Sequence, residues 1–310
     1  MATIPGRVGS ASGAEKCQSD HAVLPLVVIV GPTASGKTSL AIRLAQQCGG
    51  EIICADSRTV YRGMDIGTAK PTLEEQAMVP HWGVDLVEPS QRFTAVDFQR
   101  YAKQKIREIR HRGHIPFLVG GTGLYVDAVV YDFQFPTVNK KLMQKISGWS
   151  LTALHEYCRT NNISLPHNKY NKRHVVNTIV RNGTEVNKRK PLNEHTFIVG
   201  IATNRDILRT RIEQRADIIV SDNVVAEAIG LAERYGWDNE AMTGNIYPII
   251  HKLQQGVITR QQARELFCRA DWHLAKRQLT WLRRNPDIVW CQLDAAYDYV
   301  MGRLAQATDV

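Results

Sequence analysis

Short apolar runs alternate with amphipathic stretches through the first 130 residues, and the pattern returns near residue 200. The run at 26–30, Leu-Val-Val-Ile-Val, predicts a buried strand, and 39–47 has the spacing of a helix with one apolar face. Strands that alternate with helices form a parallel sheet. We therefore expect an α/β fold in which helices flank a parallel sheet. Further strands are predicted at 51–54, 84–86, 116–119 and 197–201, and a further helix at 98–112.

The pattern changes between residues 132 and 191, where apolar periodicity weakens and Asn, Lys, Arg and His accumulate around one short helix at 151–159. We expect 132–191 to form a small, mostly helical domain inserted between strands of a main domain, 23–131 and 192–310. Residues 1–22 lack the apolar segment of a secretory signal and are predicted to be a flexible extension. Helices in the C-terminal part are predicted at 205–219, 224–235, 247–254, 260–282 and 295–304.

Composition narrows the class of protein. The 310 residues are 44% hydrophobic and 22% charged, as in globular proteins. The longest apolar stretch, 23–30, is far shorter than the ~20 residues of a membrane-spanning helix, so no membrane association is expected. The six cysteines have no zinc-ligand spacing and are interpreted as reduced thiols of a cytoplasmic protein. A monomer is expected as the default oligomeric state. The net charge of +9 favours a polyanionic partner without identifying one.

A phosphate-binding motif stands between the first predicted strand and helix. The octapeptide matches GxxxxGK[ST], in which glycines let backbone N–H groups surround a phosphate while the helix N-terminus adds positive charge. The strand, loop and helix together predict a P-loop NTPase-like sheet. The lysine should reach terminal phosphates, and the final threonine should hold Mg²⁺. The residues of this cradle are Gly31, Pro32, Thr33, Ala34, Ser35, Gly36, Lys37 and Thr38.

The motif alone does not decide which phosphate compound is bound. An ATP or GTP hydrolase would show an apolar strand that ends in a magnesium-binding aspartate. Asp85 in the run at 84–86 is a weak candidate, and 116–119 ends in glycine. This argues against a motor or switch NTPase and leaves small-molecule kinases open.

Acidic and basic residues near the predicted cradle suggest catalytic roles. Asp56 follows the second strand directly, at the edge where open α/β sheets bind ligands. A cap or turn role is the alternative for this carboxylate. Arg211 and Arg215 are one helical turn apart, so both leave one helix face, where they either bind phosphate or are simply solvated.

Four sequence blocks in order resemble the tRNA dimethylallyltransferase family: GPTASGKT at 31–38, ADSRTVYRGMDIGTAKP at 55–71, VGGTGLY at 119–125 and AKRQLTWLRR at 275–284. The resemblance implies that the cradle holds the diphosphate of dimethylallyl diphosphate. It also implies that Asp56 is the general base for the adenine N6 amine and that Arg211 reaches the diphosphate. Thr122 would hydrogen-bond the bridging oxygen, with capping of the following helix as the alternative or additional role.

Two basic stretches, 169–190 and 260–284, contain seven Lys or Arg each, and the second also contains Trp272, His273 and Trp281. Cations bind phosphates while aromatic rings stack on unpaired bases, a combination typical of single-stranded RNA binding. A solvated helix face is the alternative for the second stretch. The target adenine must be flipped out of the anticodon loop to react. The residues expected to contact tRNA are Asp56, Ser57, Arg58, Thr59, Arg173, Lys276, Arg277, Gln278, Trp281 and Arg283.

The sequence departs from the family at several positions. Asn177 and Val180 stand where an arginine and a glutamate are usual, and His81-Trp82 replaces a His-His pair. No zinc finger follows the helical tail, so the bacterial form of the family is the better match. The resemblance implies transfer of a dimethylallyl group to N6 of adenosine 37 in tRNAs that read codons starting with U. A P-loop kinase, an adenylate isopentenyltransferase and a non-catalytic RNA-binding protein remain the alternatives.

Overall fold

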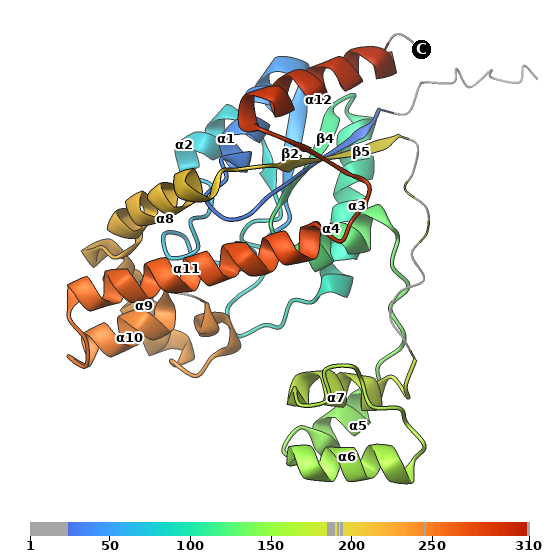
Figure 1. Cartoon of the computed structure of the whole chain (residues 1–310), viewed down its shortest axis with the longest axis vertical. Helices are drawn as coiled ribbons and strands as arrows, with labels where there is room; N and C mark the ends of the chain where they lie inside the picture. The colour runs from blue at the N-terminus through green and yellow to red at the C-terminus, as the bar shows by residue number, and fades with distance from the viewer. Residues whose placement is uncertain (1–23, 185–189, 191, 193–194, 245, 309–310) are drawn as a thin grey trace, which may run out of the picture.

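The computed structural model describes residues 24–184, 190, 192, 195–244 and 246–308. Its centre is a six-stranded parallel sheet with the strand order β3-β2-β4-β1-β5-β6 (Figure 1). The central strands β1, β2, β4 and β5 are buried along their whole length. Their near-continuous apolar sequences fit a sheet covered on both faces. The strands are β1 (Leu26–Val30), β2 (Gly50–Cys54), β3 (His81–Trp82), β4 (Ile115–Gly120), β5 (Thr196–Ile201) and β6 (Ile288–Cys291).

Helices cover both faces of the sheet. Successive residues of a strand point to opposite faces, so Val28 packs in one core with α3 (Ala95–His111) and α4 (Gly123–Val130). Val27 and Ile29 pack in the other core with α1 (Lys37–Cys48) and α12 (Leu293–Thr308). The fold class predicted from the sequence is confirmed.

Two strand assignments differ from expectation. The strand predicted at 84–86 is wrong, because the edge strand β3 lies at His81–Trp82 and pairs with β2. Gly83 and Asp85 both have positive φ angles, 86° and 52°, which turn the chain out of the sheet directly after β3. Strand β6 was not predicted; it is only four residues long and follows the turn at Pro286-Asp287.

Four helices and a short 3-10 turn form a second lobe below the sheet. They pack around a separate apolar core that includes Val60, Tyr61 and Met64 from the loop after β2. The long helix α11 runs from this lobe back to α4 under the sheet (Figure 1). The elements are α8 (Arg205–Ile219), α9 (Asp222–Tyr235), η1 (Glu240–Thr243), α10 (Tyr247–Gln254) and α11 (Arg260–Leu282), and the short α2 (Leu73–Met78) lies beside α1.

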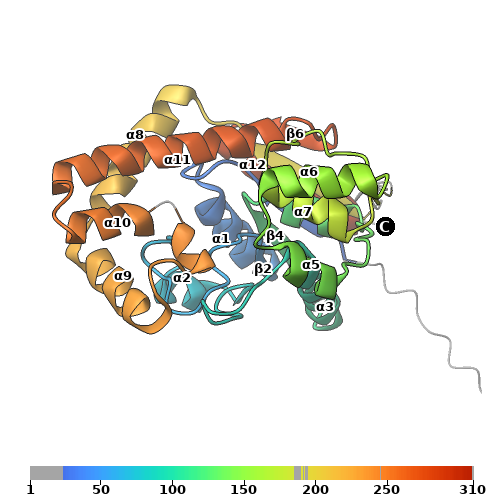
Figure 2. The same ribbon diagram turned by 90° about the horizontal axis from the view of Figure 1, so that it is seen from below.

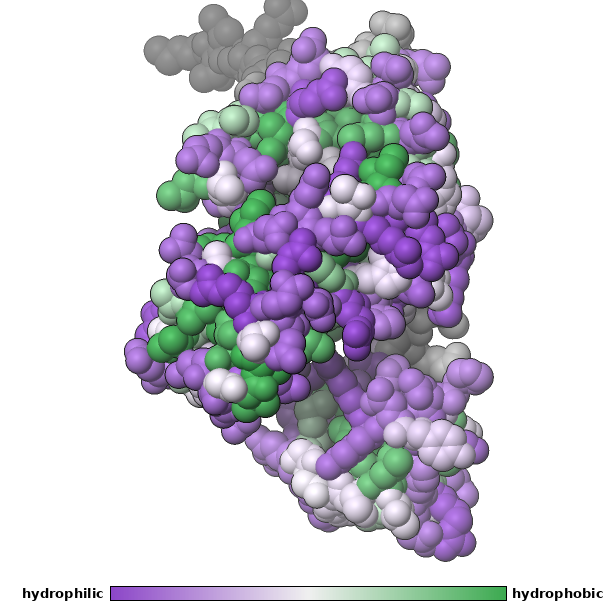
Figure 3. All heavy atoms as spheres, turned by 60° about the vertical axis from the view of Figure 1, so that its left-hand side comes forward, coloured by the Kyte–Doolittle hydropathy of each residue, from purple (hydrophilic) through white to green (hydrophobic). Residues whose placement is uncertain are grey.

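A third lobe consists of α5 (Lys140–Ile146), α6 (Leu151–Thr160) and α7 (Lys172–Val180), with its own small apolar core. It projects from the body (Figure 1), and a hollow separates the two (Figure 3). The prediction of one helix here is wrong, because the short helices α5 and α7, of 7 and 9 residues, lie among many polar residues and were not recognised. The domain boundaries at 132 and 191 stay a prediction, and the 1–22 extension lies outside the described residues. Within the described part, every helix is too short or too polar to cross a membrane.

A buried carboxylate ties the amino end of β2 to β3, to the end of α3 and to the turn before β4. Glu51, which is 2% exposed, accepts hydrogen bonds from Arg112 Nη2 at 2.7 Å and Trp82 Nε1 at 2.6 Å, and lies 2.6 Å from His114 Nδ1. Burial alone would raise the pKa of Glu51, but the hydrogen bonds from Arg112, His114 and Trp82 lower it to about 2.

We expect Glu51→Gln to lower the free energy of unfolding at pH 7 by about 2 kcal/mol, because charged hydrogen bonds are lost. A depressed pKa stabilises the folded state only above the ordinary carboxyl pKa, so the difference from the native protein should shrink as pH falls from about 5 to about 2. Urea unfolding at pH 7, 4 and 3 measures this, with Glu233→Gln, at an exposed position of α9 (Asp222–Tyr235), as the control that changes little. An equal deficit at pH 7 and pH 3 would show that the Glu51 charge is not responsible.

Candidate active site

The predicted phosphate cradle has the geometry of an anion site. The loop 31–36 leaves β1 and turns into α1 through Ala34 and Gly36, with φ angles of 60° and 91°. A Cβ on Gly31 would lie 2.8 Å from Ser35 Oγ and 3.3 Å from Ile201 Cβ, so glycine there leaves room for the close turn. No side chain caps α1, and its first turn has no acidic residue. The N–H groups and positive dipole end of α1 are therefore available to a phosphate.

Side chains from distant helices fix Thr33 in this loop. Arg215 Nη1 donates to Thr33 Oγ1 at 2.7 Å, and the Thr33 hydroxyl lies 3.4 Å from Asp271 Oδ2. The Thr33 N–H donates to Gln278 Oε1 at 2.8 Å, and Arg211 Nη1 donates to the Ser35 carbonyl at 3.0 Å. Helices α8 and α11 therefore hold the loop from outside the sheet.

Lys37 is the cation at the centre of the cradle. Its Nζ donates to the Pro32 carbonyl at 3.2 Å. Burial lowers the pKa of the Lys37 ammonium to about 8; the carboxylates of Asp56 and Asp271 oppose this shift, and the Arg215 guanidinium adds to it. The ammonium is mostly protonated at pH 7 and able to pair with a diphosphate.

Asp56 stands at the carboxyl end of β2, beside the end of β4. Its Oδ1 accepts the Arg58 N–H at 2.7 Å, and the neighbouring Ser57 N–H donates to Thr122 Oγ1 at 3.2 Å. The Thr122 side chain makes no capping hydrogen bond to α4, so the capping alternative is wrong. Glycine lets the two loops approach, because a Cβ on Gly120 would lie 2.1 Å from the Ala55 carbonyl oxygen.

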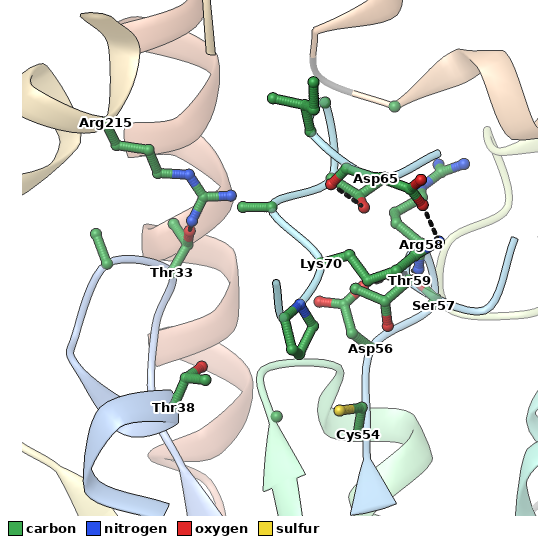
Figure 4. A pocket seen from close by; sticks show the side chains of 18 of the residues that line it. Thr33, Thr38, Cys54, Asp56, Ser57, Arg58, Thr59, Asp65, Lys70 and Arg215 are labelled. Atoms are coloured by element: carbon green, nitrogen blue, oxygen red, sulfur yellow. Dashed lines mark hydrogen bonds and ion pairs between the residues drawn. The ribbon is translucent and has the colours of Figure 1, made fainter. Parts of the chain in front are cut away.

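One cavity of about 970 Å³ joins the cradle to Asp56. Figure 4 shows Thr33, Thr38 and Arg215 on one side of it and Asp56 and Ser57 on the other. Thr122 and Gln278 also line the cavity. The arrangement places the phosphate cradle and a carboxylate on opposite walls of the same space, as group transfer from a phosphorylated donor requires.

Comparisons with known proteins agree with this geometry. The profile of the IPP transferase family matches residues 59–285, and that of the isopentenyl transferases matches 24–81. The chain belongs to the IPP transferase family. A tRNA dimethylallyltransferase of Staphylococcus saprophyticus is 35% identical over 284 residues, covering 86% of this chain and 90% of the relative. A tRNA dimethylallyltransferase of Geobacter sulfurreducens is 37% identical over 298 residues, which cover 89% of this chain and 94% of the relative.

Solved structures of tRNA prenyltransferases have the same fold as this chain. The tRNA isopentenylpyrophosphate transferase of Bacillus halodurans superimposes with a TM-score of 0.69 at 33% identity, covering 92% of this chain and 98% of that one. A eukaryotic dimethylallyltransferase acting on tRNA has a TM-score of 0.70 at 22% identity, covering 87% and 74%, and shows the shared fold. This IPP transferase family member therefore has the P-loop NTPase-like fold of its relatives and is an enzyme that transfers a prenyl group.

The residues expected to contact tRNA lie in different surroundings in this family member. Arg58 donates to the Glu240 and Ala241 carbonyls of η1 at 3.3 and 3.2 Å, and Thr59 is buried in the cavity wall. The Arg173 guanidinium on α7 lies 3.9 Å from the Glu240 carboxylate, across the hollow between the lobes.

Three of the expected tRNA-binding residues of α11 line a shallow groove of about 300 Å³. Lys276, Arg277 and Trp281 line the groove, and Arg277 also lines the main cavity. The Trp281 indole donates to Asp127 Oδ2 at 2.8 Å and remains 41% exposed. Gln278 points into the cradle instead, and Arg283 is exposed at the end of α11.

Several cavity residues were not predicted as site residues. Lys70, whose side chain is 3% exposed, pairs with Asp65 and Asp85. Glu227 of α9 accepts the N–H groups of Ile66 and Gly67 at 2.8 and 3.0 Å, which fixes the loop that carries Lys70. Glycine and Asp in 63–68 signalled an ordered loop, but no local signal marks Glu227. Arg215 was considered with Arg211 as a phosphate-binding or solvated residue, but its contact with Thr33, and the place of Asp271 beside it, were not predicted.

The cradle also fits a divalent cation. Thr38 lies in the first turn of α1 and lines the cavity beside the phosphate loop. Mg²⁺ keeps several waters and needs only one or two protein oxygens when phosphate oxygens complete its shell. Within the described residues there is no group of three or more His, Cys, Asp or Glu that could hold a metal alone.

Burial and the nearby Asp56 charge raise the pKa of the Cys54 thiol in the cavity wall to about 12, so it stays protonated.

Proposed function

We propose that this protein transfers a dimethylallyl group from dimethylallyl diphosphate to N6 of adenosine 37, next to the anticodon, in tRNAs that read codons starting with U. The observation that carries the proposal is the single cavity that joins the phosphate cradle to Asp56 and opens beside the basic helix α11. A kinase of small metabolites would use the cradle but has no need of the groove at Lys276, Arg277 and Trp281.

The cradle would hold the diphosphate as the leaving group. As the allylic C–O bond breaks, its electron pair moves to the diphosphate, and Lys37 with the N–H groups of the loop stabilises the growing negative charge. Arg215 and Arg211 brace the same loop through Thr33 and Ser35. We propose that Thr38 holds Mg²⁺, which when bound would neutralise part of this charge.

Thr122 and Asp56 are arranged for complementary proton roles. Thr122 Oγ1 already accepts the Ser57 N–H, so its own hydrogen remains to be donated to the bridging oxygen. Asp56 accepts the Arg58 N–H through Oδ1, which leaves Oδ2 for the amine of the adenine. The N6 lone pair forms the new C–N bond, and Asp56 takes the proton that N6 loses.

The adenine would reach this cavity only when flipped out of the anticodon loop. Arg58, Arg173 and the α11 residues Lys276, Arg277, Trp281 and Arg283 are proposed to hold the flanking nucleotides. The cytoplasmic location and monomeric state stay predictions.

The acceptor and donor can be tested together. The protein with Mg²⁺ is offered unmodified tRNA or adenosine monophosphate, each with dimethylallyl diphosphate or with ATP labelled in its terminal phosphate. We expect prenylated adenosine only from tRNA and dimethylallyl diphosphate, measured by mass after nuclease digestion. Prenylation of the free nucleotide would support the adenylate enzyme, and transfer of labelled phosphate would support a kinase.

Replacing Lys276 and Arg277 together by Gln should weaken tRNA binding and lower the slope of log affinity against log salt by about 1.4 to 1.8, because two phosphate contacts are lost. Fluorescence anisotropy with labelled tRNA between 0.05 and about 0.3 M salt measures this. A slope equal to that of the native protein would refute the phosphate-binding role of these two residues.

A further inference from the structure

Three cations surround one indole where α8 and α11 pack together. The Arg205 and Arg209 guanidinium carbons of α8 lie 5.4 and 5.1 Å from the centroid of the Trp272 ring, and Lys276 Nζ lies 5.7 Å from it. All three cations are exposed, and Trp272 is half-buried between them. We call these four residues the α8/α11 patch.

The charges of this patch are not neutralised by the protein. In the part of the chain that the structure describes, none of the three cations forms an ion pair with a carboxylate. Two other arginines of α11 are paired: Arg264 with Asp217, and Arg260 with Asp222. Repulsion among the three clustered cations disfavours the patch unless an anion lies over it. The indole relieves only part of this repulsion, because cation–π contacts at exposed sites are weak.

The patch is separate from the diphosphate site. Leu208 and Ile212 are buried in a small cluster with Ala275, and they divide the arginines of α8 into two pairs. Arg211 and Arg215 face the cradle loop. Arg205 and Arg209 instead leave the other side of α8, over Trp272. A diphosphate in the cradle would therefore lie near Arg211 and Arg215, and not near Arg205 and Arg209.

The patch is continuous with the groove proposed to bind RNA. Lys276 belongs to both: it lies over Trp272 and lines the groove with Arg277, Trp281 and Arg284. Helix α8 crosses α11 in Figure 2 and packs against it, so Arg205 and Arg209, which lie over Trp272, extend this positive surface beyond the groove. A ligand that covers both must carry negative charge at several successive positions, which an RNA backbone does and a diphosphate does not.

We propose that Arg205 and Arg209, with Trp272 and Lys276, form a second RNA-binding surface that holds the phosphate backbone of the acceptor RNA outside the catalytic cavity. This inference rests on the proposed function. Guanidinium groups bind phosphate oxygens in a bidentate way, and the half-buried indole holds the two arginines side by side. The surface adds affinity without touching the reacting adenine.

The test is the double variant Arg205→Gln/Arg209→Gln. We expect affinity for unmodified tRNA at 0.1 M salt to fall about 10- to 30-fold and the salt slope to fall by about 1.4 to 1.8, while KM for dimethylallyl diphosphate is unchanged. Arg205→Lys/Arg209→Lys should keep the native slope, because both charges remain. The matched control is Arg43→Gln/Arg303→Gln. It removes two exposed arginines, Arg43 of α1 and Arg303 of α12, which also lie over aromatic rings, those of Tyr297 and Phe197.

Each outcome is decisive. If the native protein binds and prenylates tRNA and the Gln variant shows the native affinity and slope, the second surface is refuted while the proposed function stands. A raised KM for the donor with unchanged tRNA affinity would refute it too, because the patch would then steer the diphosphate. A native protein that neither binds nor modifies tRNA would overturn the proposed function and this inference together.

Discussion

Asp56→Asn should lower turnover by about 10²- to 10⁴-fold while affinity for tRNA stays nearly unchanged. The amide keeps an oxygen for the Arg58 N–H, which Asp56 Oδ1 accepts at 2.7 Å, so the loop after β2 keeps its shape. The amide cannot take the proton that the adenine amine loses when the C–N bond forms. Single-turnover prenylation of tRNA, with affinity measured separately by anisotropy, tests both halves of this expectation.

Asp65→Asn is the matched control. Asp65 also lines the cavity, but it pairs with Lys70, which keeps Asp85 as its second carboxylate. We expect a loss of less than about tenfold, since no proton transfer is assigned to it. Near-normal turnover of Asp56→Asn, or an equal loss in both variants, would remove Asp56 as the general base.

Lys37→Ala should abolish productive binding of the donor, with kcat/KM for dimethylallyl diphosphate reduced by about 10³-fold. The Lys37 ammonium is the charge proposed to pair with the diphosphate, and among the described residues that line the cavity the other lysine, Lys70, lies on the side of Asp56. Lys252→Ala on α10 removes an exposed lysine outside the cavity and serves as the control. Saturation by the donor at native concentrations would contradict the cradle assignment.

The lowered pKa of Lys37 predicts that kcat/KM for the donor depends on pH. Burial lowers the pKa of Lys37 to about 8, so the free enzyme loses this charge as pH rises through that value. We expect kcat/KM for the donor to decline above about pH 8 in the native protein. Lys37→Arg should retain charge and move the decline to higher pH; an unmoved decline would assign it to another group.

The sheet was largely predictable because its strands are local apolar runs between glycines. The strand at 26–30 and the helices at 205–219, 247–254 and 260–282 have the predicted bounds. The errors have local causes. At 84–86, positive φ angles at Gly83 and Asp85 override strand propensity, and in the third lobe α5 and α7 are short helices of 7 and 9 residues in a polar stretch, where a helix is hard to recognise from one sequence.

The site was predictable only where its residues are close in sequence. The phosphate cradle is eight consecutive residues, and a motif describes it fully. The contacts of Thr33 with Arg215 and Gln278 join residues 182 and 245 positions apart, and Glu227 reaches Gly67 across 160. Such pairings depend on how α8, α9 and α11 fold over the sheet, which one sequence does not reveal.

The most direct measurement of the central claim is mass spectrometry of nuclease fragments from unmodified tRNA incubated with the protein, Mg²⁺ and dimethylallyl diphosphate. The account predicts one dimethylallyl group in place of one hydrogen, on N6 of the adenosine next to the anticodon, and its loss with Asp56→Asn. Unmodified fragments, or a prenyl group on any other nucleotide, would contradict it.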